Sequence, residues 1–219
     1  KKPDEVILWL SKDEFDDNSL PESLIKFKRR GLTIKYCMDI GPHTKLFYAA
    51  REYPDNLLIT IDDDIIYPFD LIENLYCTYL KYPECICCNS AKKISFDTKK
   101  NILSYSKWER VSNFIPPNKY LLPLGVNGVL YFPRCFDEEF FNVEKLIELC
   151  PKADDIWFRI HTLRNNFDVV TTGMYPYLIN DFFPLVTSTV DALDSQNVLN
   201  GGNDKQLKSV LKYFNIELF

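Results

Sequence analysis

The sequence has few histidines and methionines and no long apolar run. Its 219 residues include two histidines, two methionines and seven glycines. No apolar stretch approaches the roughly 20 residues that a helix needs to cross a bilayer. This excludes a membrane-spanning helix, and any membrane association would be peripheral.

A second close cysteine pair, which a zinc site would need, is also lacking. The seven cysteines are an odd number and are scattered. Cys85 and Cys88 form a C-x-x-C, but Cys87 lies between them in an apolar run, so a zinc site is not indicated. We expect reduced thiols that pack as small hydrophobic side chains, in a cytoplasmic protein that could lie at the inner face of the plasma membrane.

Basic residues are outnumbered by acidic ones. A net charge of -5 and a pI near 5.2 argue against a general nucleic-acid-binding surface. One basic cluster ends a predicted helix and is interpreted as a solvated helix end, with contact to anionic lipid headgroups as the alternative. It comprises Lys26, Lys28, Arg29 and Arg30. No linker divides residues 1–219, so we expect a single α/β domain, and the immediate start in a strand without an initiator Met predicts a fragment.

The stretch with the clearest chemical signature is residues 57–68, LLITIDDDIIYP. Its apolar start lacks polar alternation, which favours a central parallel strand covered on both faces. Asp62, Asp63 and Asp64 follow at the carboxyl end, where open α/β sheets bind ligands. In extended chain Asp62 and Asp64 point to one side and Asp63 to the other. A divalent cation, Mg²⁺ or Mn²⁺ shared with a phosphate ligand, would relieve the repulsion of these carboxylates.

A solvated loop with a helix N-cap is the alternative for this triplet, because Asp is a common cap and turn residue. The context favours the metal. The triplet directly follows a predicted buried strand, and Pro68 is expected to open a helix with apolar residues at helical spacing.

A second predicted strand, LTIKYC (32–37), leads into DIGPHTKL. Asp39 ends the strand, and Thr44 could cap a helix that runs to about Tyr53. Lys45 would lie in the first turn of that helix. A cation there opposes the helix dipole, so the position is consistent with a bound phosphate, although a merely exposed lysine is the alternative.

Two glycines bracket a tight segment in LPLGVNGVLYFP (122–133). Gly125 and Gly128 could provide either a structural turn or a close approach of the backbone to a ligand.

The second acidic feature is PKADDIWFRIHTLRNN (151–166), which predicts a helix with Asp154 and Asp155 in its first turn. Two interpretations stay open: complementarity to the helix dipole, or a carboxylate base carried on a rigid element. His161 points to a different side from Asp155 and is interpreted as packing or surface, with ligation of a metal as a lesser alternative; His43 is left unassigned.

The other expected elements are strands at 5–10, 85–96, 102–108 and 167–172, a helix opening at Pro21 and closed by Gly31, a turn at 97–101, and a polar loop before a terminal helix capped near Asn203 or Asp204. Gly201 and Gly202 suit either a mobile flap or an ordinary connection.

Taken in order, the segments KPDEVILWLS, DIGPHTKL, YPDNLLITIDDDIIYP, YSKW, GVNGVLYFP, LCPKADDIWF and NDKQL resemble a family of bacterial glycosyltransferases of the GT-A type, found among capsule, lipopolysaccharide and other surface-glycan genes. The resemblance covers nearly the whole chain. Two departures stand out: the chain begins after the strand, helix and Ser-Leu-Thr-Ser-type segment with which family members usually start, and Asn127 stands where a small residue is common.

The resemblance implies a Rossmann-like domain with a central, mostly parallel sheet flanked by helices. It implies a nucleotide-sugar donor, UDP-linked by preference, and a glycan or lipid-linked acceptor. Asp64 and Asp62 would hold Mn²⁺ or Mg²⁺ with the donor diphosphate, and Asp63 would face the ribose or the donor sugar. Asp39 and Lys45 would contact the nucleotide or diphosphate, with the backbone at Gly128 close to the ligand.

The same resemblance implies inversion at the anomeric carbon, with Asp155 as base and Asp154 positioning the acceptor or the base. Tyr131, Trp108 and Trp157 could stack on sugars, although core packing is the commoner role of aromatic residues. The alternatives are an inactive glycan-binding or scaffold protein of the same fold, and a sugar nucleotidyltransferase, whose glycine- and basic-rich phosphate loop the sequence lacks.

Overall fold

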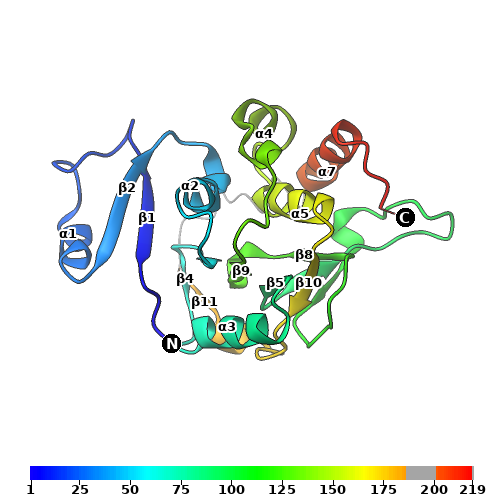
Figure 1. Ribbon diagram of the computed structural model, residues 1–219, viewed down its shortest axis with the longest axis horizontal. Coiled ribbons are helices and arrows are strands. Elements are labelled where there is room, and N and C mark those ends of the chain that lie inside the picture. Colours follow the sequence, from blue (N-terminus) through cyan, green and yellow to red (C-terminus); the bar gives the residue numbers. More distant parts are fainter. Residues whose placement is uncertain (186–200, 219) are drawn as a thin grey trace.

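The computed structural model describes residues 1–185 and 201–218 and has mixed α/β architecture (Figure 1). The helices are α1 (Glu22–Lys28), α2 (Thr44–Glu52), α3 (Leu71–Lys81), α4 (Val143–Leu149), α5 (Asp154–Arg164), α6 (Leu178–Asp181) and α7 (Gly202–Tyr213). The strands are β1 (Val6–Ser11), β2 (Leu32–Cys37), β3 (Leu58–Thr60), β4 (Ile65–Ile66), β5 (Cys85–Cys88), β6 (Ala91–Lys93), β7 (Glu109–Val111), β8 (Leu121–Pro123), β9 (Val129–Tyr131), β10 (Asp168–Thr171) and β11 (Phe183–Pro184). Four short 3-10 turns are η1 (Gly41–His43), η2 (Tyr105–Lys107), η3 (Gly125–Asn127) and η4 (Glu138–Phe141).

The central sheet has four strands in the order β10-β5-β9-β3. β10 and β5 are parallel, whereas β9 runs antiparallel to both β5 and β3. β1 and β2 form a separate parallel pair, β7-β6-β8 is an antiparallel three-stranded sheet, and β4 pairs antiparallel with β11. The central sheet is therefore mixed in direction.

The two faces of the central sheet belong to two apolar cores. Along β5, Ile86 and Cys88 belong to the core that includes α5, and Cys85 and Cys87 to the core that includes α3. In Figure 1 these helices lie on opposite sides of the sheet. Alternation of side chains along a strand covered on both faces explains why every residue of β5 is buried and apolar.

The expectation that residues 57–61 form a central parallel strand is wrong. β3 is an end strand of the four-stranded sheet and pairs antiparallel with β9. Both of its faces are nevertheless covered, because Leu58 packs against one core and Ile59 against the other. The apolar run is only partly buried, since Leu58 and Ile59 keep some exposure and Ile61 is 45% exposed. Contact with two cores does not reveal the direction of the partner strand.

Other expected elements differ in detail. Residues 102–108 were expected to form a strand but contain one isolated bridge, Phe96 to Ile102, and the turn η2. α3 begins three residues after Pro68, with Asp70 at its N-cap. The terminal helix α7 begins at Gly202, and the polar loop expected before it lies largely outside the described residues.

The single strand expected at 85–96 is two strands, β5 and β6, which belong to different sheets. The remaining expected elements are confirmed to within a few residues: β1, β2, β10, α1, α2 and α5. All seven cysteines are free thiols, and all but Cys77 are buried. Within the described ranges, no helix is both long and apolar enough to cross a membrane.

Candidate functional site

Lys45 joins the two acidic segments of the chain. It lies in the first turn of α2, which follows η1 and the left-handed Gly41 (φ +66°). Its ammonium Nζ is 2.7 Å from Asp62 Oδ1 and 3.0 Å from Asp154 Oδ2. Residues from the end of β3 and the start of α5, far apart in sequence, therefore meet at one cation.

Asp155 is held beside this ion pair by a backbone amide. The N–H of Gly125 donates to Asp155 Oδ1 at 3.0 Å. Burial, and then the neighbouring Asp154 carboxylate, raise the pKa of Asp155 to about 8, against the opposing effects of Lys45 and of the Gly125 N–H. A carboxylate with a pKa in this range suits proton transfer near neutral pH better than an ordinary aspartate does.

The charge state of Lys45 is set by the same carboxylates. Burial lowers the pKa of its ammonium, but Asp154 and Asp62 outweigh burial, so the pKa is raised overall. Lys45 is therefore a permanent positive charge in a cluster of three carboxylates, and the net charge of this cluster is negative when Asp155 is ionised.

The acidic triplet is tied to the glycine segment through Tyr67. The backbone N–H of Asp62 donates to the Tyr67 hydroxyl at 2.8 Å, and that hydroxyl donates to the carbonyl of Val126 at 3.0 Å. Asp62 is half-buried, whereas Asp63 and Asp64 are exposed. The backbone of Asp64 is fixed separately, because its carbonyl accepts the N–H of Leu185 at 2.7 Å.

The fit of these acids to a divalent cation depends on the type of site. In the part of the chain described, no three acidic, histidine or cysteine side chains gather closely enough to hold a metal ion. Asp62 and Asp64 offer the hard carboxylate oxygens that Mg²⁺ and Mn²⁺ prefer. The residues thus fit an open site that a ligand's phosphate oxygens and water would complete, and they do not fit a closed protein cage.

The two glycines of the GVNG segment have different surroundings. A Cβ on Gly125 would lie 2.9 Å from Lys45 Nζ and 3.0 Å from Asp155 Oδ1, so the missing side chain leaves room for the site. Gly128 has φ +86°, and its Cβ would lie 3.1 Å from Leu71 Cδ1. Gly128 thus serves a turn packed on α3.

A polar network, buried except at Arg110, connects this segment to neighbouring strands. The Asn127 side-chain oxygen accepts from the Ser90 hydroxyl at 2.8 Å and from Arg110 at 2.5 Å. The Asn127 carbonyl accepts from the Asn89 side chain at 2.9 Å. Asn127, at the position where the family resemblance implies a small residue, therefore ties the GVNG segment to Asn89, Ser90 and Arg110.

Asp39 and His43 form no hydrogen bond or ion pair with this cluster in the described part of the chain. Asp39 is exposed, and its carboxylate accepts the N–H of Gly41 at 2.7 Å, within its own turn. His43 is fully buried, and neither ring nitrogen has a hydrogen-bond partner within the described residues. Burial lowers the pKa of His43 to about 4, although Asp154 opposes this.

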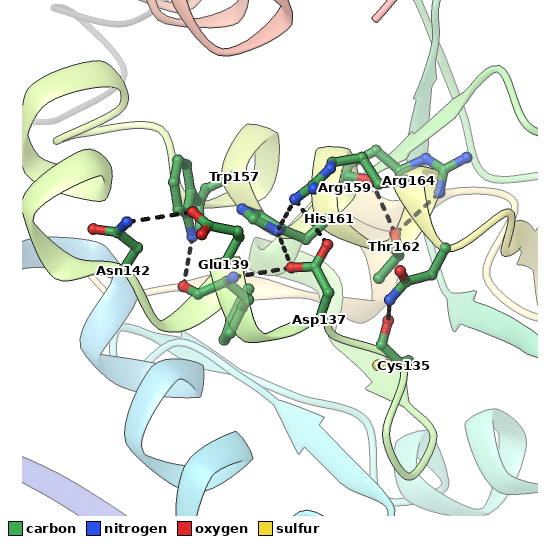
Figure 2. Close-up of polar contacts among 11 residues, drawn as sticks. Cys135, Asp137, Glu139, Asn142, Trp157, Arg159, His161, Thr162 and Arg164 are labelled. Carbon is green, nitrogen blue, oxygen red and sulfur yellow. Dashed lines mark hydrogen bonds and ion pairs between the residues drawn. The ribbon is translucent and has the colours of Figure 1, made fainter. Parts of the chain in front are cut away.

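α5 is anchored at its far end by an ionic network. His161 Nδ1 lies 2.8 Å from Asp137 Oδ1, and Arg164 lies 2.8 Å from Asp137 Oδ2. Figure 2 shows both side chains converging on the Asp137 carboxylate, which also accepts the N–H of Phe140 at 3.0 Å. The interpretation of His161 as a packing residue is confirmed, because it is fully buried.

The three aromatic residues considered for sugar stacking pack in the core. Trp108, Tyr131 and Trp157 are each at most 3% exposed. The Trp157 indole N–H donates to the carbonyl of Phe140 at 3.1 Å (Figure 2).

Sequence reasoning missed two contributors to the site: the N–H of Gly125 and the hydroxyl of Tyr67. Both act through one or two hydrogen bonds that involve backbone atoms, which leave no periodic signal in a sequence.

Comparison of the chain with models of known protein families and with curated proteins finds no match.

Proposed function

We propose that this protein is a metal-dependent glycosyltransferase that moves a sugar from a nucleotide-sugar donor to a glycan or lipid-linked acceptor with inversion. The observation that carries the proposal is the meeting of Asp62, Lys45, Asp154 and Asp155 in one cluster, with the pKa of Asp155 raised. The two acidic motifs on which the family resemblance rests are thus adjacent in space.

The donor side of the proposed reaction belongs to the acidic triplet. Asp64 and Asp62 would hold Mn²⁺ or Mg²⁺, which supplies charge neutralisation for a departing diphosphate. Lys45 would contribute a further positive charge toward the same phosphates, and Asp63 would face the ribose or the donor sugar. With its charge neutralised, the leaving diphosphate needs no proton from an acid.

The acceptor side belongs to Asp154 and Asp155. In molecules whose Asp155 is ionised, the acceptor hydroxyl loses its proton to this carboxylate while its oxygen forms the new bond to the anomeric carbon and the bond to the diphosphate oxygen breaks. Because the pKa of Asp155 is raised to about 8, this ionised fraction grows as the pH rises toward 8. A single displacement needs one base on the acceptor face, and it inverts the configuration. The N–H of Gly125 orients Asp155 by donating to the Oδ1 atom, which leaves Oδ2 for the proton.

The roles of the two acids are separable by substitution. Asp64→Asn should abolish Mn²⁺-dependent binding of nucleoside diphosphate, measured by titration calorimetry, because it removes a hard anionic ligand. Asp155→Asn should preserve this binding and lower transfer at least about a hundredfold, as loss of a general base does.

Asp4→Asn is the matched control, since Asp4 is an exposed acid near the N-terminus and should change neither quantity. Normal transfer by Asp155→Asn would disprove the base assignment. Nucleotide binding by wild-type protein without turnover of any donor would favour the glycan-binding or scaffold alternative.

A further inference from the structure

The surroundings of the Lys45 ammonium suit a cation. Two carboxylate oxygens lie within 3.0 Å of Nζ, and the third side is the bare backbone of Gly125. About a quarter of the lysine side chain is exposed, so the ammonium borders the solvent that a ligand would enter from. The Lys45 ammonium is thus a positive charge of the protein itself, next to the place where a divalent metal ion is proposed to bind.

The ammonium and a divalent cation would compete for Asp62. Within the described chain, Lys45 is the ion-pair partner of Asp62, and it engages Oδ1 at 2.7 Å. A divalent ion ligated by Asp62 would stand within a few ångströms of the ammonium, where like charges repel strongly at the low dielectric of a half-buried site. Asp64, by contrast, has no ion pair within that range of residues.

A diphosphate changes this balance because it is an anion. Once it is present, the ammonium can leave Asp62 for a phosphate oxygen and still keep Asp154, while Asp62 becomes free for the metal. The attraction between ammonium and phosphate then replaces the repulsion between ammonium and metal.

We propose that Lys45 is a resident counter-ion of Asp62 that disfavours binding of a divalent cation alone and favours its binding together with a nucleoside diphosphate. This inference rests on the proposed function. Lys45 would weaken the complex with the divalent cation alone and strengthen the complex with the cation and a nucleoside diphosphate together.

The test measures Mn²⁺ affinity by water-proton relaxation, with and without UDP, for wild type and lysine variants. Lys45→Met should bind Mn²⁺ alone about tenfold more tightly than wild type and Mn²⁺ with UDP about tenfold more weakly. Lys45→Arg keeps the charge and should resemble wild type in the Mn²⁺-alone titration. Lys35→Met removes a lysine that pairs with Glu52 outside the cluster, and should change neither affinity.

Lys45→Gln serves if the methionine variant does not fold, because an amide can still donate a hydrogen bond to Asp62 without carrying charge. Like Lys45→Met, it should bind Mn²⁺ alone more tightly than wild type and Mn²⁺ with UDP more weakly. Simple structural damage would weaken both complexes, so equal or weaker binding of Mn²⁺ alone by the neutral variants would overturn the inference while leaving the proposed function intact. Absence of Mn²⁺ binding by wild type, even with UDP or GDP, would overturn the proposed function itself.

Discussion

At the scale of single residues, Tyr67 links the acidic triplet to the glycine segment with one hydroxyl group. It accepts from the N–H of Asp62 and donates to the carbonyl of Val126. Burial raises the pKa of this phenol, so it stays protonated and can fill both roles.

Tyr67→Phe should lower the free energy of unfolding by about 1–3 kcal/mol, because it leaves a backbone donor and a backbone acceptor unpaired. It should also weaken Mn²⁺-UDP binding, because Asp62 loses its backbone anchor. Urea unfolding and titration calorimetry measure the two effects. Unchanged metal-nucleotide affinity would show that Tyr67 does not position Asp62.

Gly125 and Gly128 lie three residues apart and make a matched pair. Gly125→Ala should lower transfer at least about tenfold, since the new methyl displaces the Lys45 and Asp155 side-chain ends. Its unfolding free energy should change by less than about 1 kcal/mol, because the atoms nearest the new methyl are the ends of side chains, which can shift, and not backbone.

Gly128→Ala should instead cost about 1–3 kcal/mol of stability, because φ is +86° and Leu71 blocks the Cβ. Chemical denaturation and a transfer assay on both variants compare the two residues. The same effects on both properties in both variants would contradict the distinct roles assigned to them.

Which individual residues the sequence could predict depends on how they contribute. Lys45, Asp154 and Asp155 act through charge, and their positions at helix starts were predictable from turn and cap residues. The Gly125 N–H bonds the side chain of Asp155, and the Tyr67 hydroxyl bonds backbone atoms of Asp62 and Val126. Such contacts depend on how segments pack, so the sequence could not predict them.

At the scale of elements, α5 carries two groups whose pKa shifts have opposite consequences for stability. Burial lowers the pKa of His161, although Asp137 and Glu139 oppose it and Arg164 assists it. Burial also lowers the pKa of His43. Unfolding therefore takes up protons at these histidines below about pH 6.5, and stability is lost as the pH falls.

Asp155 acts in the other direction. Its pKa is raised when folded, so the stability it contributes is present at low pH and is lost as the pH rises through about 8. Between pH 7 and 5 the folded state holds a proton on Asp155 that the unfolded state lacks, and this difference offsets proton uptake by one of the two histidines on unfolding.

Asp155→Asn should therefore lose stability more steeply than wild type on acidification from pH 7 to 5, by up to about 1.4 kcal/mol per pH unit. Near pH 8 and above, the variant should be as stable as wild type or more stable, because a buried negative charge is gone. Urea unfolding at each pH provides the comparison. Parallel pH profiles would mean that Asp155 is ionised in the folded protein at neutral pH.

Helices and strands with a strongly periodic or continuously apolar sequence were predicted well. Segments whose conformation depends on tertiary contacts were not. The run CICC predicted β5 because alternate side chains enter two cores. Residues 102–108 looked equally strand-like, but Trp108 and Tyr105 are buried through the turn η2, where the Trp108 indole donates to the carbonyl of Leu103. Burial of aromatic side chains does not require a strand.

At the scale of the whole molecule, the mixed α/β class followed from alternating apolar segments, but the sheet order did not. The chain leaves β5 for the three-stranded sheet β7-β6-β8 and returns as β9, which inserts between β5 and β3. This return places the GVNG turn beside the acidic triplet, as the Tyr67 hydrogen bonds show. The direction of β9 depends on that excursion, which no local pattern encodes.

We propose that the cluster of Lys45 and the acids catalyses metal-dependent sugar transfer. The most direct measurement is release of nucleoside diphosphate from UDP-, GDP- and CMP-linked sugars, with release of CMP followed for the last, in the presence and absence of Mn²⁺. We expect Mn²⁺-dependent release from at least one donor by the wild type, and loss of this release in Asp64→Asn. Release that is equal in wild type and Asp64→Asn, or absent for every donor tested with glycan and lipid-linked acceptors, would contradict it.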